Sequence, residues 1–310
     1  MSLVDALFGA FALPFMSRAL LVMLVLSVVA GVVGVLVNLR GLEFISDGLT
    51  HAVFPGLAIG LAVGGAAGVL PGAAIAALLG AVALTWLLRS GIANDAGIAV
   101  VLTAAFSIGV IVVSRSDDYA GALEELLFGR VLTIPPSDVV PLVVISAIAL
   151  AMVGITAKQQ VFRAFDPAGS RAAGNREFAL DLTLNAAVAL VVVAGASTVG
   201  SLLVLALLVV PGATARLLSG RLWRLFPIAG AFAAIASWLG LSAGFAASVG
   251  AGVDLPAGST IVAVFVLAYA VVLLGSLLVS AAGRRGARRD GLRAAAPTAR
   301  AVAHAGEGRP

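Results

Sequence analysis

Long apolar stretches, separated by short polar or charged breaks, run through most of the chain. A helix that crosses the hydrocarbon core of a bilayer needs about 20 mostly apolar residues. Nine stretches come close to that length: 16–38, 45–64, 69–88, 96–113, 139–156, 178–194, 199–217, 226–249 and 259–281. The pattern therefore predicts an all-α fold, that of a polytopic helical membrane protein.

Two features of the pattern leave the number of crossings open between eight and nine. The stretch 45–64 contains Asp47, His51 and several glycines, so it is a weak span on its own. The stretches 178–194 and 199–217 are separated by only four residues. Eight spans with one re-entrant segment therefore fit the sequence as well as nine spans do.

The composition supports a membrane location and excludes several functional classes. Hydrophobic residues make up 61% of the 310 residues and charged residues 11%, whereas soluble domains carry about 25% charged residues. The absence of cysteine excludes disulfides and thiolate metal sites. The chain has no phosphate-binding loop of the Gly-x-x-x-x-Gly-Lys-Ser/Thr type, so it is not expected to be an enzyme that hydrolyses ATP. Any ATP-driven transport would depend on a partner ATPase.

Positive charge is concentrated in the C-terminal tail. The whole chain carries a net charge of +4, and residues 283–310 contain seven arginines against Asp290 and Glu307, a net of +5. Because this basic segment has no interleaved aromatic residues, no nucleic-acid partner is expected. The sequence therefore divides into an interfacial N-terminal segment (1–15), a transmembrane domain (16–282), and a basic, disordered cytoplasmic tail (283–310) near anionic membrane lipid.

The distribution of Lys and Arg predicts the orientation, because cytoplasmic loops of membrane proteins are rich in these residues. With nine spans and an external N-terminus, 16 of the 19 Lys and Arg residues face the cytoplasm. The external side holds the other three, Arg18, Arg115 and Arg130, with most of the acidic loop residues: Asp117, Asp118, Glu124, Glu125, Asp138 and Asp254. We therefore expect a multi-pass protein of the cell (inner) membrane, with its N-terminus outside and its C-terminus in the cytoplasm.

Asp47 and His51 are the best candidates for a functional site inside the membrane. A charged group at the bilayer centre costs about 2.5–3.5 kcal/mol on insertion scales, so such residues usually have a function. The two residues lie four apart, on one face of a helix, and the only other histidine is His304 in the tail. A carboxylate beside an imidazole suits zinc, manganese or ferrous iron. A simple hydrogen bond, or a cap by Asp47 at a helix start, would explain the same spacing.

This pair is only half of a metal-binding shell. One protomer would supply one carboxylate and one imidazole nitrogen. A symmetric dimer with its two-fold axis along the pore would supply two of each. We therefore expect a second protomer to complete the site.

A short helix is predicted in the basic loop between the fifth and sixth apolar stretches. Asp166 can cap this helix, Pro167 suits its first position, and Gly174 can end it. About two turns of helix lying parallel to the membrane would give a soluble motor protein a rigid lever. An ordinary solvated, positively charged loop would have the same composition.

Four ordered motifs resemble those of the permeases of zinc and manganese ABC importers. The first is 14–20, followed by 39–42 leading into 46–52, and the others are 94–99, 165–174 and 200–218. The resemblance covers residues 14–282 and implies the fold of a type II-like ABC importer permease, with about 8–9 transmembrane helices. Ser46 and Thr50 stand where the family often has glycine and serine, and neither departure removes a ligand.

The resemblance also implies partners and residue roles. Asp47 and His51 would bind the transported Zn²⁺ or Mn²⁺, and no cofactor would be bound permanently. The contact with the ATPase would involve five residues of the short loop helix: Phe165, Asp166, Pro167, Arg171 and Gly174. The chain would work as a dimer, with cytoplasmic ATP-binding subunits on one side and an extracytoplasmic metal-binding protein on the other.

Three other functions stay open at the level of the sequence. A permease for a metal chelate, such as a siderophore or cobalamin complex, would need a wider cavity and no direct ion ligands. A proton-coupled secondary transporter with Asp47 as the carrier would need no ATPase. A structural membrane-assembly protein would leave metal-dependent growth unchanged on deletion.

Overall fold

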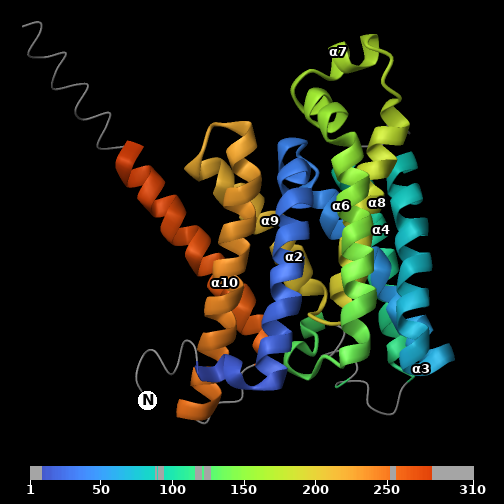
Figure 1. Cartoon of the computed structure of the whole chain (residues 1–310). Coiled ribbons are helices and arrows are strands. Elements are labelled where there is room, and N and C mark those ends of the chain that lie inside the picture. Colours follow the sequence, from blue (N-terminus) through green and yellow to red (C-terminus); the bar gives the residue numbers. More distant parts are fainter. Residues whose placement is uncertain are drawn as a thin grey trace, which may run out of the picture.

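The computed structural model describes residues 9–87, 89, 94–115, 121, 127–251 and 256–280, and this part of the chain contains helices and no strands (Figure 1). The elements are η1 (Gly9–Ala12), α2 (Pro14–Leu39), α3 (Glu43–Leu87), α4 (Asn94–Val113), η2 (Val131–Thr133), α6 (Pro136–Phe165), α7 (Pro167–Ala172), α8 (Glu177–Ala196), α9 (Ser201–Leu218), α10 (Leu222–Ala251) and a last, unlabelled helix, Ala257–Ser280. Eight of the described helices are long and apolar enough to cross a membrane. The predicted all-α, multi-pass fold is confirmed.

The longest helix, α3, is a hairpin of two helices. Gly65 lies in its middle with φ 58° and ψ −151°, a conformation that glycine adopts far more readily than other residues. The two halves, 43–64 and 66–87, pack against each other, since a Cβ atom built on Gly60 would lie 2.3 Å from the carbonyl oxygen of Gly68. Residues eight apart in a straight helix are separated by about 12 Å. The chain therefore reverses its direction at Gly65.

The α3 hairpin decides between eight and nine membrane crossings for the described residues. Each half is about 33 Å long at 1.5 Å per residue, which is enough for a hydrocarbon core of about 30 Å. The halves correspond to the predicted stretches 45–64 and 69–88. The α3 hairpin therefore supplies two of nine membrane-crossing segments among the described residues, and no re-entrant segment is needed.

Each half of the hairpin contains a proline at the same level. Pro55 and Pro71 lie inside α3 and directly precede Gly56 and Gly72. A Cβ atom built on Gly56 would lie 2.3 Å from the carbonyl oxygen of Gly72. Small residues at such positions allow the backbones of membrane helices to approach closely.

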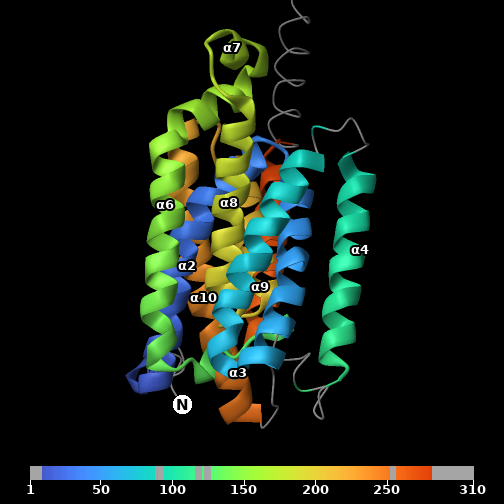
Figure 2. The same ribbon diagram turned by 90° about the vertical axis from the view of Figure 1, so that its right-hand side faces the viewer.

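The centre of the bundle is formed by α2 and α8. In the most apolar windows of these helices 67% and 61% of residues are buried, compared with 11% for the last helix, Ala257–Ser280. The α2 helix packs against α6, α9 and α10, and α8 packs against α3 and α6. The α4 helix packs against the α3 hairpin at the edge of the molecule (Figure 2). Exposed apolar side chains on the outer helices, such as Leu274 and Leu278, suit a surface that faces lipid.

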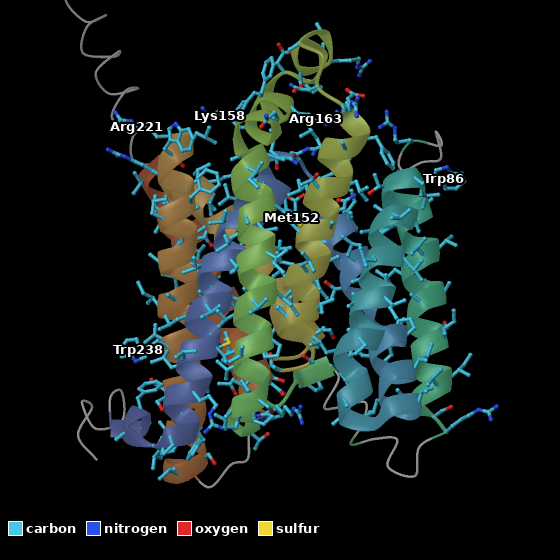
Figure 3. All side chains as sticks on the ribbon, turned by 45° about the vertical axis from the view of Figure 1, so that its right-hand side comes forward. Trp86, Met152, Lys158, Arg163, Arg221 and Trp238 are labelled. Carbon is cyan, nitrogen blue, oxygen red and sulfur yellow. The ribbon has the colours of Figure 1, made fainter. Side chains whose placement is uncertain are left out.

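The two ends of the bundle differ in charge. The α7 helix projects beyond the other helices at one end, the α7 end, and η1 with the start of α2 lies at the opposite end (Figure 1). Figure 3 shows Lys158, Arg163 and Arg221 near the α7 end, with Trp86 at about the same level. Nine described Lys and Arg residues belong to the α7 end: Arg40, Arg89, Lys158, Arg163, Arg171, Arg176, Arg216, Arg221 and Arg224. Three belong to the opposite end: Arg18, Arg115 and Arg130.

Several predictions concern residues outside the described ranges. These are residues 1–8 of the N-terminal segment, the basic tail 283–310, and the acidic residues Asp117, Asp118, Glu124, Glu125 and Asp254. The described part of the N-terminal segment forms the short helix η1, and α2 begins at Pro14. The division of the chain into three segments stays a prediction.

Candidate functional site

Asp47 and His51 lie in the first half of α3, near the α7 end. Because α3 begins at Glu43, the two residues lie about 6 and 12 Å along its axis at 1.5 Å per residue. The residues between and beside them are buried: Ser46, Gly48, Leu49 and Thr50. The side chains of Asp47 and His51 are 30% and 22% exposed. The pair therefore lies on a partly accessible face of a segment that is otherwise buried.

His51 is hydrogen-bonded through Nδ1 to the backbone carbonyl of Asp47 and lies close to the carboxylate of the same residue. Nδ1 of His51 lies 3.2 Å from Oδ1 of Asp47 and 3.1 Å from the backbone carbonyl oxygen of the same residue. In a neutral imidazole with its proton on Nδ1, His51 donates this bond and Nε2 carries the lone pair that can bind a metal. A carboxylate that orients an imidazole in this way is usual beside metal-bound histidine. Asp47 does not cap the helix, since α3 begins one turn earlier.

The buried hydroxyl groups next to the pair are bonded within α3. Ser46 Oγ donates to the carbonyl oxygen of Leu42 at 3.3 Å, and Thr50 Oγ1 donates to that of Ser46 at 2.8 Å. Bonds of this kind to the preceding helical turn satisfy a buried hydroxyl locally. Ser46 and Thr50 therefore leave the Asp47–His51 pair undisturbed.

An aromatic side chain from α4 forms one wall beside the pair. The rings of Phe106 and His51 meet edge to face, with centroids 5.8 Å apart and an interplanar angle of 63°. Phe106 also stacks on Phe54 with centroids 5.4 Å apart. These contacts lie within the usual range for aromatic pairs. They restrict the imidazole in addition to its contacts with Asp47.

The pair does not complete a metal shell within one protomer. Across the described residues, no group of three or more His, Cys, Asp or Glu side chains is arranged to hold a metal ion. Structural zinc sites in proteins usually have four ligands, and manganese prefers more oxygen ligands than one carboxylate supplies. One chain thus offers one carboxylate and one imidazole.

The predicted loop helix is present as α7. Asp166 Oδ1 accepts a hydrogen bond from the backbone N–H of Gly169 at 2.8 Å, and Pro167 occupies the first turn. The backbone turns at Gly174, whose φ is 82°. The local prediction of a capped helix with a proline at its start is therefore confirmed.

All five predicted ATPase-contact residues lie around α7. Phe165 is 68% exposed, and the side chain of Arg171 is 71% exposed. Asp166 and Pro167 form the start of the helix, and Gly174 follows its end. An exposed apolar ring and an exposed guanidinium group on one short segment are suitable for contact with another protein. The contact itself stays a prediction.

A cluster of ion pairs at the start of α8 was not predicted from the sequence. Glu177 and Asp181, one turn apart on α8, together bind four arginines from α6, α7 and the chain on both sides of α3. The signal in the sequence was limited to two carboxylates four residues apart at the start of an apolar stretch, which resembles an ordinary helix start.

Comparison with known proteins supports one family. The model of the ABC 3 transport family matches residues 12–276. The manganese transport system membrane protein MntC of Listeria monocytogenes is 31% identical over 273 residues, which cover 88% of this chain and 96% of that protein. The manganese import system permease protein ScaB of Streptococcus gordonii is 30% identical over 249 residues, which cover 80% and 88% of the two chains.

Solved structures share the fold. The structure of PsaBC from Streptococcus pneumoniae in complex with Fab is similar with a TM-score of 0.74 and 28% sequence identity, covering 87% of this chain and 94% of that chain. An inward-facing transporter assigned to the metal-chelate type has a TM-score of 0.66 at 13% identity, covering 84% and 85%, which shows a shared fold alone. The chain therefore belongs to the ABC 3 transport family: it is a multi-pass membrane permease of an ABC transporter, a transport subunit and not an enzyme.

Proposed function

We propose that this chain is the permease of an ATP-driven manganese importer, in which Asp47 and His51 bind the ion as it crosses the membrane. The observation that carries this proposal is the hydrogen-bonded Asp47–His51 pair on a partly exposed face of a membrane-crossing helix. Manganese transport is the named activity of similar permeases, which supports manganese over zinc as the cargo.

The partial exposure of the pair supports a position on the ion pathway. Ionisable side chains at membrane depth rarely face lipid, and they usually line a water-filled route or a protein interface. Asp47 and His51 retain 30% and 22% exposure, so the accessible surface has to be covered by water or by another protein. Both are expected along a translocation pathway between two permease protomers.

A dimer provides the donors that one chain lacks. Two protomers related by a two-fold axis would place two carboxylates and two imidazoles around the same axis. Carboxylates bound through one or both oxygens would give manganese four to six donors, and the same set would satisfy tetrahedral zinc. Because an ion bound too tightly would not leave, a site of modest affinity suits conduction.

The charge difference between the two ends supports an orientation with the α7 end in the cytoplasm. Nine described Lys and Arg residues belong to the α7 end and three to the opposite end, which matches the positive-inside rule. ATP-binding subunits would then contact α7 from the cytoplasm, and an extracytoplasmic metal-binding protein would deliver the ion at the opposite end. ATP binding would move α7, and the bundle would open the pathway to one side at a time.

A transport assay with purified components tests this function. The permease is reconstituted into vesicles with its ATP-binding subunit and its metal-binding protein, and ATP-dependent uptake of manganese and zinc is measured. Wild-type uptake of free manganese, lost in Asp47→Ala and His51→Ala, is the expected result. If both variants take up manganese at the wild-type rate, the ion is not bound by this pair.

The same assay distinguishes transport of manganese from transport of a chelated metal or of zinc. One solved transporter assigned to the metal-chelate type shares the fold, and a chelate would be carried without direct contact between the ion and Asp47 or His51. Uptake of a siderophore or cobalamin complex, unaffected by His51→Ala, would therefore favour that alternative. Faster uptake of zinc than of manganese at equal concentration would instead assign zinc as the cargo.

A further inference from the structure

Two carboxylates at the start of α8 bind arginines from separate parts of the chain. Asp181 accepts hydrogen bonds from Arg40, in the link between α2 and α3, and from Arg163 in the last turn of α6, at 2.8 Å for the latter. The Arg40 side chain is 9% exposed. Asp181 therefore links the ends of α2 and α6. Removal of one partner from a buried ion pair leaves an unpaired buried charge and strongly destabilises the protein.

Glu177 extends the same cluster to α7 and to the far end of the α3 hairpin. Its Oε1 atom lies 3.1 Å from Nε of Arg171 in α7 and 3.1 Å from Nη1 of Arg163. Its Oε2 atom lies 3.8 Å from Nη2 of Arg89, which follows the end of α3. The carboxylate of Glu177 therefore contacts α6, α7 and Arg89, which follows the end of the hairpin.

Both α7-side ends of the α3 hairpin are thus tied to α8. Arg40 stands three residues before the hairpin begins at Glu43, and Arg89 stands two residues after it ends at Leu87. The start of the hairpin is also held by Asn38, whose Nδ2 donates to Oε1 of Glu43 at 2.8 Å. Asp47 lies one helical turn beyond Glu43.

The cluster contains a buried amide and borders a polar cavity. Gln160 is fully buried in it, where its Oε1 accepts from Arg40 at 3.0 Å and its Nε2 donates to the carbonyl oxygen of Leu180 at 2.8 Å. A cavity of about 280 Å³ lies among the charged groups and is lined by Arg40, Leu42, Arg89, Arg163, Glu177, Asp181 and Asn185. A polar cavity of this size can hold water, so the charged groups are not enclosed by apolar side chains on every side.

We propose that Glu177 and Asp181 form a charged joint that transmits a displacement of α7 to both ends of the α3 hairpin, and so positions Asp47 and His51. This proposal rests on the proposed function. Arg171 connects the joint to α7, and Arg40 and Arg89 connect it to the hairpin. Glu177 and Asp181 act as positioning residues, since neither contacts the Asp47–His51 pair.

The first test measures coupling in the complete transporter. Manganese uptake and ATP hydrolysis are measured in the same vesicles for the wild type and for Asp181→Asn, which keeps the shape of the side chain. The number of ions imported per ATP should fall about tenfold, within the range of coupling between distant sites, while ATP hydrolysis continues. The matched control is Asp138→Asn, which removes a carboxylate paired with Arg130 at 3.2 Å at the opposite end. The control should keep the wild-type ratio.

The second test follows the hairpin directly and does not depend on transport. The chain contains no cysteine, so a single thiol introduced as Phe44→Cys, at an exposed position next to the start of α3, can be labelled selectively with a maleimide. ATP binding should change the labelling rate of Phe44→Cys in the otherwise wild-type chain. In the chain that also carries Asp181→Asn, the labelling rate should be the same with and without ATP. A thiol at Ala172→Cys in α7 should respond to ATP in both backgrounds, which shows that the variant is folded and still engages the ATPase.

The outcomes distinguish the two proposals. A wild type that does not import manganese contradicts the proposed function. A wild type that imports manganese, together with an Asp181→Asn variant that keeps the wild-type number of ions per ATP and the wild-type change in Phe44→Cys labelling, overturns the charged joint alone. A parallel loss of uptake and hydrolysis in Asp181→Asn also overturns it, because a joint transmits motion and does not drive hydrolysis.

Discussion

Nδ1 of His51 lies 3.2 Å from Oδ1 of Asp47, one helical turn earlier on the same face of α3. Together with the hydrogen bond from Nδ1 to the backbone carbonyl of Asp47, this contact determines which ring nitrogen would be available to an ion. If Nδ1 donates to the carboxylate, the lone pair for metal binding is on Nε2. The edge of Phe106, whose centroid is 5.8 Å from that of the imidazole, limits rotation of the ring. The imidazole is therefore held in one orientation by its contacts with Asp47 and Phe106.

Replacement of His51 by alanine should reduce manganese uptake roughly tenfold or more, since loss even of groups that only support a metal ligand costs 10- to 100-fold. The measurement is initial uptake by vesicles that contain the complete transporter. His304→Ala changes the only other histidine, in the tail, and should leave uptake unchanged. Equal uptake by His51→Ala and His304→Ala would remove His51 from the pathway.

Replacement of Asp47 by asparagine separates two roles of the carboxylate. An amide oxygen can still accept the hydrogen bond from Nδ1 of His51, but it carries no charge for a divalent ion. We expect Asp47→Asn to lose most manganese uptake, nearly as much as Asp47→Ala. Wild-type uptake by Asp47→Asn, with loss in Asp47→Ala, would instead show that Asp47 orients His51 without binding the ion.

Replacement of Gly60 by alanine should destabilise the hairpin of α3. The added methyl group would lie 2.3 Å from the carbonyl oxygen of Gly68, so the two halves must separate, at a cost of about 1–3 kcal/mol typical of overpacking. Thermal unfolding of the purified permease in detergent measures the change. Gly154→Ala is the matched control, because no atom lies within 4 Å of a Cβ atom at that position in α6. A melting temperature for Gly60→Ala equal to that of the control would contradict the close contact.

Replacement of Asp166 by alanine should weaken α7 at its start. The Asp166 carboxylate accepts the hydrogen bond of the Gly169 N–H group at 2.8 Å, and loss of such a cap costs about 0.5–2 kcal/mol. We expect stimulation of ATP hydrolysis by the loaded metal-binding protein to fall in Asp166→Ala and to be largely retained in Asp166→Asn, which can still cap. Equal stimulation in wild type and both variants would mean that the ordered start of α7 is not needed for contact with the ATPase.

The parts of the molecule that depend on local chemistry follow from the sequence. Apolar length predicted the membrane-crossing helices, and Asp166, Pro167 and Gly174 predicted a capped helix that is present. The spacing of Asp47 and His51 placed them on one helical face, and the structure brings them into hydrogen-bond contact. In each case the interacting residues are at most eight positions apart.

The ion-pair cluster could not be predicted in the same way. Arg40 and Asp181 are separated by 141 positions, and Arg40 and Gln160 by 120, so their contact depends on how whole helices pack. A charged residue at the end of an apolar stretch satisfies the positive-inside rule whether or not it has a partner. The reversal at Gly65 differs from the cluster, because the predicted stretches 45–64 and 69–88 already left a break between two spans at this position.

The two prolines of the α3 hairpin interrupt the backbone hydrogen bonding of both helices at the same level of the membrane-crossing segment. Proline has no backbone N–H to donate, so Pro55 leaves the carbonyl group of His51 without its usual helical donor, and Pro71 does the same for Ala67. The backbones are in direct contact at this level, at Gly56 and Gly72, so neither half can bend alone. The two helices of the hairpin would therefore bend together at the level of the prolines. Asp47 and His51 lie on the α7 side of this level. Such flexing would tilt the face that carries Asp47 and His51 toward one membrane surface or the other while the two helices stay together.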